Sequence, residues 1–194
     1  MSTWTLVQVV AVTNSGGLSP VGFVDVQPLV SQVDGIGQST PHGILSHLPY
    51  FRIQGGKNAV IIDPEVGDIG IVVFADHDIS AVKNARGQAN PGSGRRFDMA
   101  DGMYFGGSLN AAPTQYVQFT PSGINVVSPT AVTIKAPSIT LDGPVTATST
   151  INAATSVTAP QVTGTTNVTF GGKSGIGHVH GGVQPGSGNT GTPL

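Results

Sequence analysis

The sequence contains no cysteine, so neither disulfide bonds nor thiol chemistry are available to it. Charge is also scarce: Asp, Glu, Lys and Arg make up 9% of the 194 residues, against about 25% in typical soluble domains. There is no run of about 18 apolar residues, so no membrane-spanning helix is expected. The first residues lack the basic start and the apolar stretch of a signal peptide, so we expect synthesis in the cytoplasm.

Basic residues are too few for a nucleic-acid partner to be expected. The net charge is −2, with eight Lys and Arg in total, whereas nucleic-acid binding needs a clear basic patch. Arg95-Arg96 is the one adjacent basic pair, and we interpret it as part of a solvated loop. A single-stranded nucleic-acid binder with a disordered tail stays an alternative, which salt-sensitive binding to single-stranded DNA would support.

The remaining charge is concentrated in the first half of the chain. Nine of the ten acidic residues and six of the eight basic residues lie at or before Asp101, which indicates a domain boundary near residues 100–115. The first half predicts about five strands and a short helix, the count of an OB-type barrel. A turn is expected at residues 63–68 and one or two helical turns within residues 76–85, with Asp76 or Asp78 as N-cap. The expected strands are Trp4–Val12, Val21–Val30, Gly43–Phe51, Asn58–Ile62 and Ile69–Phe74.

The second half is rich in residues that favour strands. Residues 111–170 hold fourteen Thr, eight Val and four Ile, all β-branched types. They form short apolar–Thr alternations every seven to ten residues, as in a β-solenoid. A single-chain solenoid of this length would have about three coils and a weak core. We therefore favour three chains wound around one axis, which would give a continuous core without free strand edges.

Two histidines one residue apart, His178 and His180, follow this repeat in a glycine-rich stretch. In an extended chain, residues i and i+2 point to the same side. Two ligands from one chain are too few for a firm metal site, but three chains would supply six imidazole nitrogens, which suit an octahedral ion such as iron(II) better than zinc. The alternative is a solvent-exposed tail that happens to carry two histidines.

Other candidate sites are weaker. Asp76-His77-Asp78 is interpreted as a surface cap or turn rather than a metal site, and His42 and His47 as strand-edge residues. Gly172-Lys173-Ser174 lacks the first glycine of a phosphate-binding loop. Polysaccharide cleavage normally needs a carboxylate pair, and Asp142 is the one acid after Asp101. We expect no enzyme activity, no catalytic or cofactor-binding residues and no small-molecule substrate.

Three features resemble the baseplate spike family (baseplate assembly protein V) of contractile-tailed bacteriophages such as Mu. They are Asp63–Ile79, which is similar to the family's barrel strands, the Thr/Val repeat, and the ending Gly177–Gly191 with its His-x-His pattern. The resemblance implies an all-β homotrimer with three parts in each chain. These are an N-terminal OB-fold barrel that docks on the baseplate hub (1–105), an intertwined trimeric β-helix (106–170) and a metal-binding apex (171–194).

The resemblance also implies a function. One iron ion (Fe²⁺) per trimer would be held at the apex by His178 and His180 of three chains. The spike would sit at the tail tip of the virion and pierce the bacterial outer membrane when the sheath contracts. The alternative is a receptor-binding or polysaccharide-degrading tail fibre, which would need exposed aromatic residues or carboxylates along the shaft.

Overall fold

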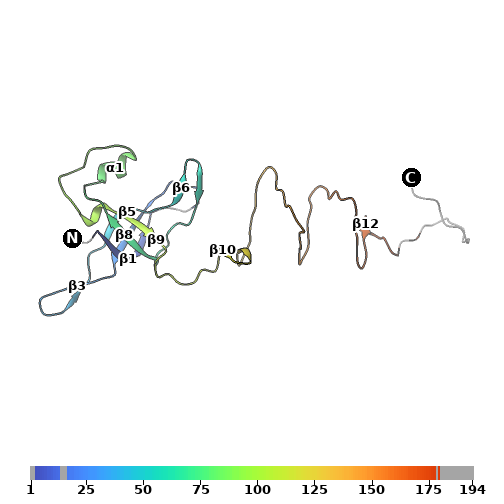
Figure 1. Cartoon of the computed structure of the whole chain (residues 1–194), viewed down its shortest axis with the longest axis horizontal. Helices are drawn as coiled ribbons and strands as arrows, with labels where there is room; N and C mark the ends of the chain where they lie inside the picture. Colours follow the sequence, from blue (N-terminus) through green and yellow to red (C-terminus); the bar gives the residue numbers. More distant parts are fainter. Residues whose placement is uncertain (1–2, 14–16, 178, 180–194) are drawn as a thin grey trace, which may run out of the picture. The chain divides into compact units, whose positions relative to one another are not determined.

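The computed structural model describes residues 3–13, 17–177 and 179. The chain is mostly strand, as predicted, and the helices among the described residues are α1 (Ser80–Ala85) and the 3-10 helix η1 (Met99–Asp101). No helix in this described part is long and apolar enough to cross a membrane. The chain divides into two compact units, residues 1–133 and 134–194 (Figure 1). The boundaries expected after residues 105 and 170 stay predictions.

A five-stranded antiparallel sheet forms the centre of the first unit. Its strand order is β5-β2-β1-β8-β9, so β1 pairs both with the next strand and with β8, about sixty residues away. The predicted strands Trp4–Val12 and Ile69–Phe74 are confirmed residue for residue, and the three others, Val21–Val30, Gly43–Phe51 and Asn58–Ile62, are shorter than expected. The five strands are β1 (Trp4–Val12), β2 (Phe23–Pro28), β5 (Leu45–Pro49), β8 (Ile69–Phe74) and β9 (Gly102–Gly106).

The core lies on one face of this sheet because alternate residues of each strand point inward. In β2, Val24 and Val26 are fully buried while their neighbours are only half-buried, and Val72 and Phe74 repeat the pattern in β8. The core consists of nine apolar or aromatic residues: Val7, Val9, Val24, Val26, Leu48, Tyr50, Val72, Phe74 and Tyr104.

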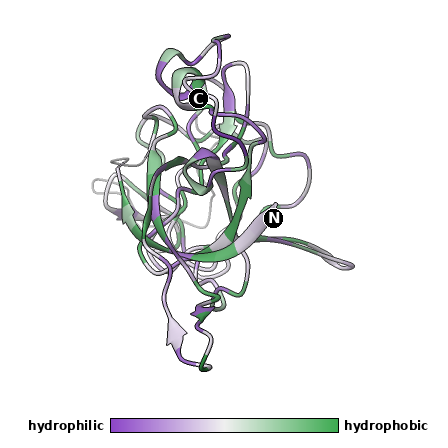
Figure 2. Ribbon diagram, turned by 90° about the vertical axis from the view of Figure 1, so that its left-hand side faces the viewer, coloured by the Kyte–Doolittle hydropathy of each residue, from purple (hydrophilic) through white to green (hydrophobic). Residues whose placement is uncertain are grey.

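The sheet curls until its two edge strands approach each other. The register between β1 and β2 shifts between Val9 and Ala11, and such a bulge bends and twists a strand. A parallel bridge joins Tyr50 to Tyr104, and the Phe51 N–H donates to the Tyr104 carbonyl at 2.8 Å. Figure 2 shows the hydrophobic strands curving around a common interior.

Three hairpins among the described residues belong to the first unit outside this sheet. One of them, β10–β11, lies in the Thr/Val-rich half of the chain, where the sequence predicts short strands, and it turns at Pro121-Ser122. The hairpins are β3 (Gln32–Val33) with β4 (Ser39–Thr40), β6 (Ile53–Gly55) with β7 (Asn58–Val60), and β10 (Tyr116–Thr120) with β11 (Gly123–Val127).

The predicted N-cap of the short helix is wrong. Helix α1 begins at Ser80, and Ile79 occupies the N-cap position without a side-chain hydrogen bond. Asp78 instead accepts a hydrogen bond from the Ser80 N–H at 2.8 Å, which closes a local turn one residue before the helix. Its carboxylate also contacts other groups from the loop that follows α1, so it is not available as a simple cap.

After β11, most of the expected repeat does not form strands within the chain. The range 128–168 contains no strand, and β12 (Thr169–Phe170) and β13 (Lys173–Ser174) follow it. Apolar side chains in this range are mostly exposed, for example 70% for Ile134 and 73% for Val157. A strand needs hydrogen bonds from a neighbouring strand, and this segment of one chain provides none of its own.

Candidate functional site

A small hairpin precedes the predicted metal-binding histidines. Strands β12 and β13 pair Phe170 with Lys173, which leaves Gly171 and Gly172 as a two-residue turn. Both glycines have positive φ angles, 53° and 79°, as a tight type I′ hairpin turn requires. The Gly-Lys-Ser sequence at this point is therefore part of a hairpin, in keeping with its rejection as a phosphate-binding loop.

Ser174 organises the backbone just before the histidines. Its hydroxyl accepts hydrogen bonds from the N–H groups of Ile176 and Gly177 at 3.2 and 3.0 Å, and it donates to Asn167 Oδ1 at 3.2 Å. The Gly175 N–H donates to the Val168 carbonyl at 2.7 Å. These bonds tie the turn at residues 174–177 to the hairpin.

The two predicted ligands themselves, His178 and His180, lie outside the described residues. Val179 between them is 92% exposed. Across residues 3–13, 17–177 and 179, no three His, Asp or Glu side chains come together in a way that could hold a metal ion. The metal site therefore stays a prediction based on the His-x-His pattern.

The other histidines each have ordinary local partners. His42 Nδ1 lies 3.2 Å from Gln32 Nε2, and the His47 ring stacks on Phe23 with centroids 3.7 Å apart. His77 contacts the Asp76 carboxylate at 2.9 Å, and this hydrogen bond lowers the pKa of Asp76. Residues 76 and 77 form a bend, as a turn would, but Asp78 is 4% exposed and therefore not on the surface as expected.

Arg95 corrects the interpretation of residues 95–96 as a solvated loop. Its guanidinium group donates to Asp101 at 2.7 Å and to Asp78 at 3.0 Å, and these aspartates are 1% and 4% exposed. Hydrogen bonds from Ser80 and Ser93, with the nearby Arg95 charge, lower the pKa of Asp78 to about 2. The sequence showed the adjacent arginines but no local signal of these partners, because the contacts span up to 17 residues.

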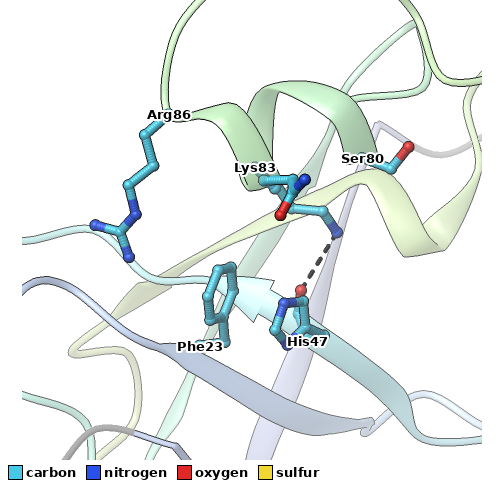
Figure 3. A pocket seen from close by; sticks show the side chains of 6 residues that line it. Phe23, His47, Ser80, Lys83 and Arg86 are labelled. Carbon is cyan, nitrogen blue, oxygen red and sulfur yellow. Dashed lines mark hydrogen bonds between the residues drawn. The ribbon is translucent and has the colours of Figure 1, made fainter.

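A groove on the first unit combines an apolar floor with two cationic side chains. Pockets of about 380 and 320 Å³ share Phe23, Lys83 and Arg86. Lys83 Nζ donates to the His47 carbonyl at 3.3 Å, as Figure 3 shows, and Arg86 donates to the Val21 carbonyl at 3.1 Å. Among the described residues neither cation contacts a carboxylate closely enough for an ion pair. The groove therefore presents net positive charge beside apolar surface.

A second polar cluster is centred on Asp63, the first residue of the predicted turn at residues 63–68. The Asp63 Oδ1 atom accepts hydrogen bonds from Arg52 and from the Tyr50 hydroxyl, the latter at 3.0 Å. Arg52 also donates to the Ser19 carbonyl at 2.8 Å. Arg52 is only 8% exposed, so this ion pair is largely shielded from solvent. The sequence analysis did not identify this cluster, because nothing local links residues 50–52 to residue 63.

Comparison with known families gives a match in the glycine-rich stretch that carries His178 and His180. Residues 176–193 match the family model described as the GpV Apex motif. This match supports a phage tail spike, and more particularly a baseplate spike of the gpV-like family, without singling out the spike of phage Mu. It also implies a component of the virion tail. Comparison with curated proteins gives no match.

Proposed function

We propose that the chain is the cell-puncturing spike of a contractile phage tail, which pierces the bacterial outer membrane when the sheath contracts. The observation that carries this proposal is the apex-motif match at residues 176–193. The motif directly follows a long segment that is poor in charge and rich in Thr and Val. A low-charge shaft reduces the cost of entering a bilayer, because burying charge is expensive.

The proposed assembly is a homotrimer. In the second unit Ile134, Leu141 and Val157 are each about two-thirds or more exposed, although apolar side chains gain free energy by leaving water. Three intertwined chains would cover these side chains and pair the backbone groups that one chain leaves unpaired in residues 128–168. Separation of such a trimer requires unthreading, so we expect its stability to be largely kinetic.

The proposed apex site holds one iron ion per trimer through His178 and His180 of three chains. Imidazole nitrogens are suitable ligands for mid-series divalent metals, so the donor set fits the ion. The hydrogen bonds of Ser174 hold the backbone up to Gly177, which would limit the freedom of the ligands that follow. The metal would crosslink a tip that has too few apolar residues for a core of its own.

The first unit is proposed to be an OB-type barrel that docks on the baseplate hub. The strand order β5-β2-β1-β8-β9 and the parallel Tyr50–Tyr104 bridge support a five-stranded barrel. The groove lined by Phe23, Lys83 and Arg86 offers an apolar and cationic surface suited to a protein partner. No enzymatic role is proposed, and the tail tip of the virion is the proposed location.

Solution mass and metal content test the proposal together. The full chain, purified without chelator, is expected to have about three times its 19.6 kDa mass and about one iron per three chains, because six nitrogens complete an octahedron. Sedimentation and elemental mass spectrometry would measure both. A monomer, or a trimer without metal, would contradict the apex model. Depolymerisation of capsular or O-antigen polysaccharide would favour the tail-fibre alternative.

A double substitution tests the ligands. His178→Ala with His180→Ala should abolish iron binding while the first unit stays folded. Both substituted residues lie in the apex motif, outside the first unit. The matched control is His42→Ala with His77→Ala, which removes two other histidines with ordinary local contacts. Loss of iron in the control, or its retention in the apex variant, would refute the assignment.

A further inference from the structure

A pocket of about 360 Å³ lies in the first unit beside the β6–β7 hairpin. Its walls include four apolar side chains that are each more than half exposed: Phe51, Ile53, Val60 and Ile62. Asp63, Asp68 and Tyr104 also line it. The pocket therefore has apolar walls around a small number of polar groups, as binding sites commonly do.

Two buried polar atoms at this pocket have no hydrogen-bond partner among the described residues. They are Asp63 Oδ2 and the hydroxyl oxygen of Tyr104. Arg52 and Tyr50 both donate to the other oxygen of Asp63, so Oδ2 is left over. An unsatisfied buried polar atom is costly. Asp63 and Tyr104 both line the pocket, so a bound group with N–H donors would lie against both residues.

The position of the Tyr104 hydroxyl supports this interpretation. Tyr104 is 1% exposed, and a Cβ atom added at Gly106 would lie 3.4 Å from the hydroxyl. Gly106 lines the same pocket, so the hydroxyl end of the ring is next to the pocket wall. Burial and the nearby Asp68 charge raise the pKa of Tyr104 to about 12, so its hydroxyl stays protonated at neutral pH.

The charged residues that line the pocket favour a cationic ligand. Asp63 and Asp68 are acidic and Arg52 is the one cation in the lining, so the pocket has a negative balance. Asp68 accepts hydrogen bonds from the Glu65 N–H at 2.9 Å and from Asn110 at 3.4 Å, which leaves its charge without a cationic partner in the described part of the chain. A suitable ligand brings N–H donors and positive charge.

We infer that this pocket receives an arginine side chain of a partner protein. The aliphatic stem of arginine packs on apolar surface, which matches the walls formed by Ile53, Val60 and Ile62. Its guanidinium group carries five N–H donors and stacks on aromatic rings, which matches the orphan acceptors and the half-exposed ring of Phe51. The pocket lies within residues 51–110, so this inference does not depend on the apex, the metal or the trimer.

The test titrates the full chain with N-acetyl-arginine-methylamide and, as the control ligand, its neutral citrulline counterpart. Backbone amide shifts of Ile62, Gly106 and Gly107 report binding in the pocket. The arginine compound is expected to bind about tenfold more tightly, because it adds charge to the same shape and hydrogen bonds to charged groups are the stronger ones. If the two compounds bind equally well, or if the shifts are confined to other residues, the pocket holds only solvent and the inference is wrong.

Two tyrosine variants separate binding from folding. Tyr104→Phe removes a hydroxyl that has no hydrogen-bond partner among the described residues, so it should leave the unfolding midpoint unchanged or higher while weakening arginine binding about tenfold. Tyr50→Phe removes a hydroxyl that donates to Asp63, so it should lower the midpoint. Unchanged arginine binding in Tyr104→Phe would refute the role of that hydroxyl, and Asp68→Asn should weaken binding independently.

Discussion

Two arginines in the first unit form ion pairs with carboxylates that are largely buried. Arg95 contacts Asp78 and Asp101, and Arg52 contacts Asp63. A buried carboxylate without its partner is strongly destabilising, because its lost hydration is not replaced. These pairs connect the loop after α1 and the chain after β7 to the sheet, so they fix segments that have few apolar contacts of their own.

The stability of the first unit is expected to fall steeply in acid. Hydrogen bonds from Ser80 and Ser93 lower the pKa of Asp78 from 3.8 to about 2, and a hydrogen bond from Arg95 also lowers the pKa of Asp101. A group with a lowered folded pKa stabilises the protein above its unfolded value, and this contribution is lost as the pH falls from about 4 toward 2. Urea unfolding at a series of pH values would measure the decline.

Asp78→Asn provides the comparison for that decline. The variant cannot be protonated at this position, so its stability should be lower at pH 5 and should fall less between pH 4 and 2 than that of the parent chain. An equal fall in both proteins would show that Asp78 does not contribute to the acid sensitivity.

At the level of elements, β8 and β9 approach each other closely at Gly70. Gly70 in β8 lies opposite Gly106, and a Cβ atom added at Gly70 would overlap the Phe105 carbonyl oxygen and approach the Tyr104 ring at 2.6 Å. A glycine inside a strand often marks such a close approach. The Tyr104 ring lies against this position, so the fold and the pocket depend on the same glycine.

Gly70→Ala is expected to destabilise the first unit by about 1–3 kcal/mol, because an extra methyl group overpacks this interface. Gly55→Ala is the matched control: Gly55 also lies in a strand, and an added Cβ would have no atom within 4 Å. Chemical denaturation of both variants would compare them. Equal effects would mean that the close contact at Gly70 does not limit packing.

At the level of the whole molecule, the proposed trimer gives the second unit its core. Apolar residues and threonines alternate along residues 131–170, and neighbouring residues of an extended chain point to opposite sides. One side would face the trimer axis and the other the solvent. Ile139, which is 52% exposed in the single chain, would be buried in such a trimer.

Adjacent substitutions distinguish the two sides. Ile139→Asp should reduce the trimer to smaller species, because it would place a charge in a dry core, whereas Thr140→Asp on the opposite side should leave the mass unchanged. Sedimentation of the two variants would measure this. Intact trimers in both cases would contradict the expected orientation of the apolar side.

The pattern of the amino acids alone determined several local features. Apolar runs and the turn residues beside them predicted the first and last residues of β1 and β8. In the predicted turn at residues 63–68, Gly67 has the expected positive φ, 101°. The His178–His180 spacing and the Thr/Val repeat are visible without any coordinates, and the apex-motif match covers the same histidines.

Only the tertiary structure decided which distant groups meet. The pairing of β1 with β8, the contacts of Arg95 with two aspartates, and the pocket that brings Phe51 and Asp63 together with Gly106 all join residues far apart in the sequence. Strand patterns and turns reflect the preferences of neighbouring residues, so a sequence shows them directly. Buried ion pairs and pockets depend on how a curled sheet brings remote segments together, and no local pattern contains that information.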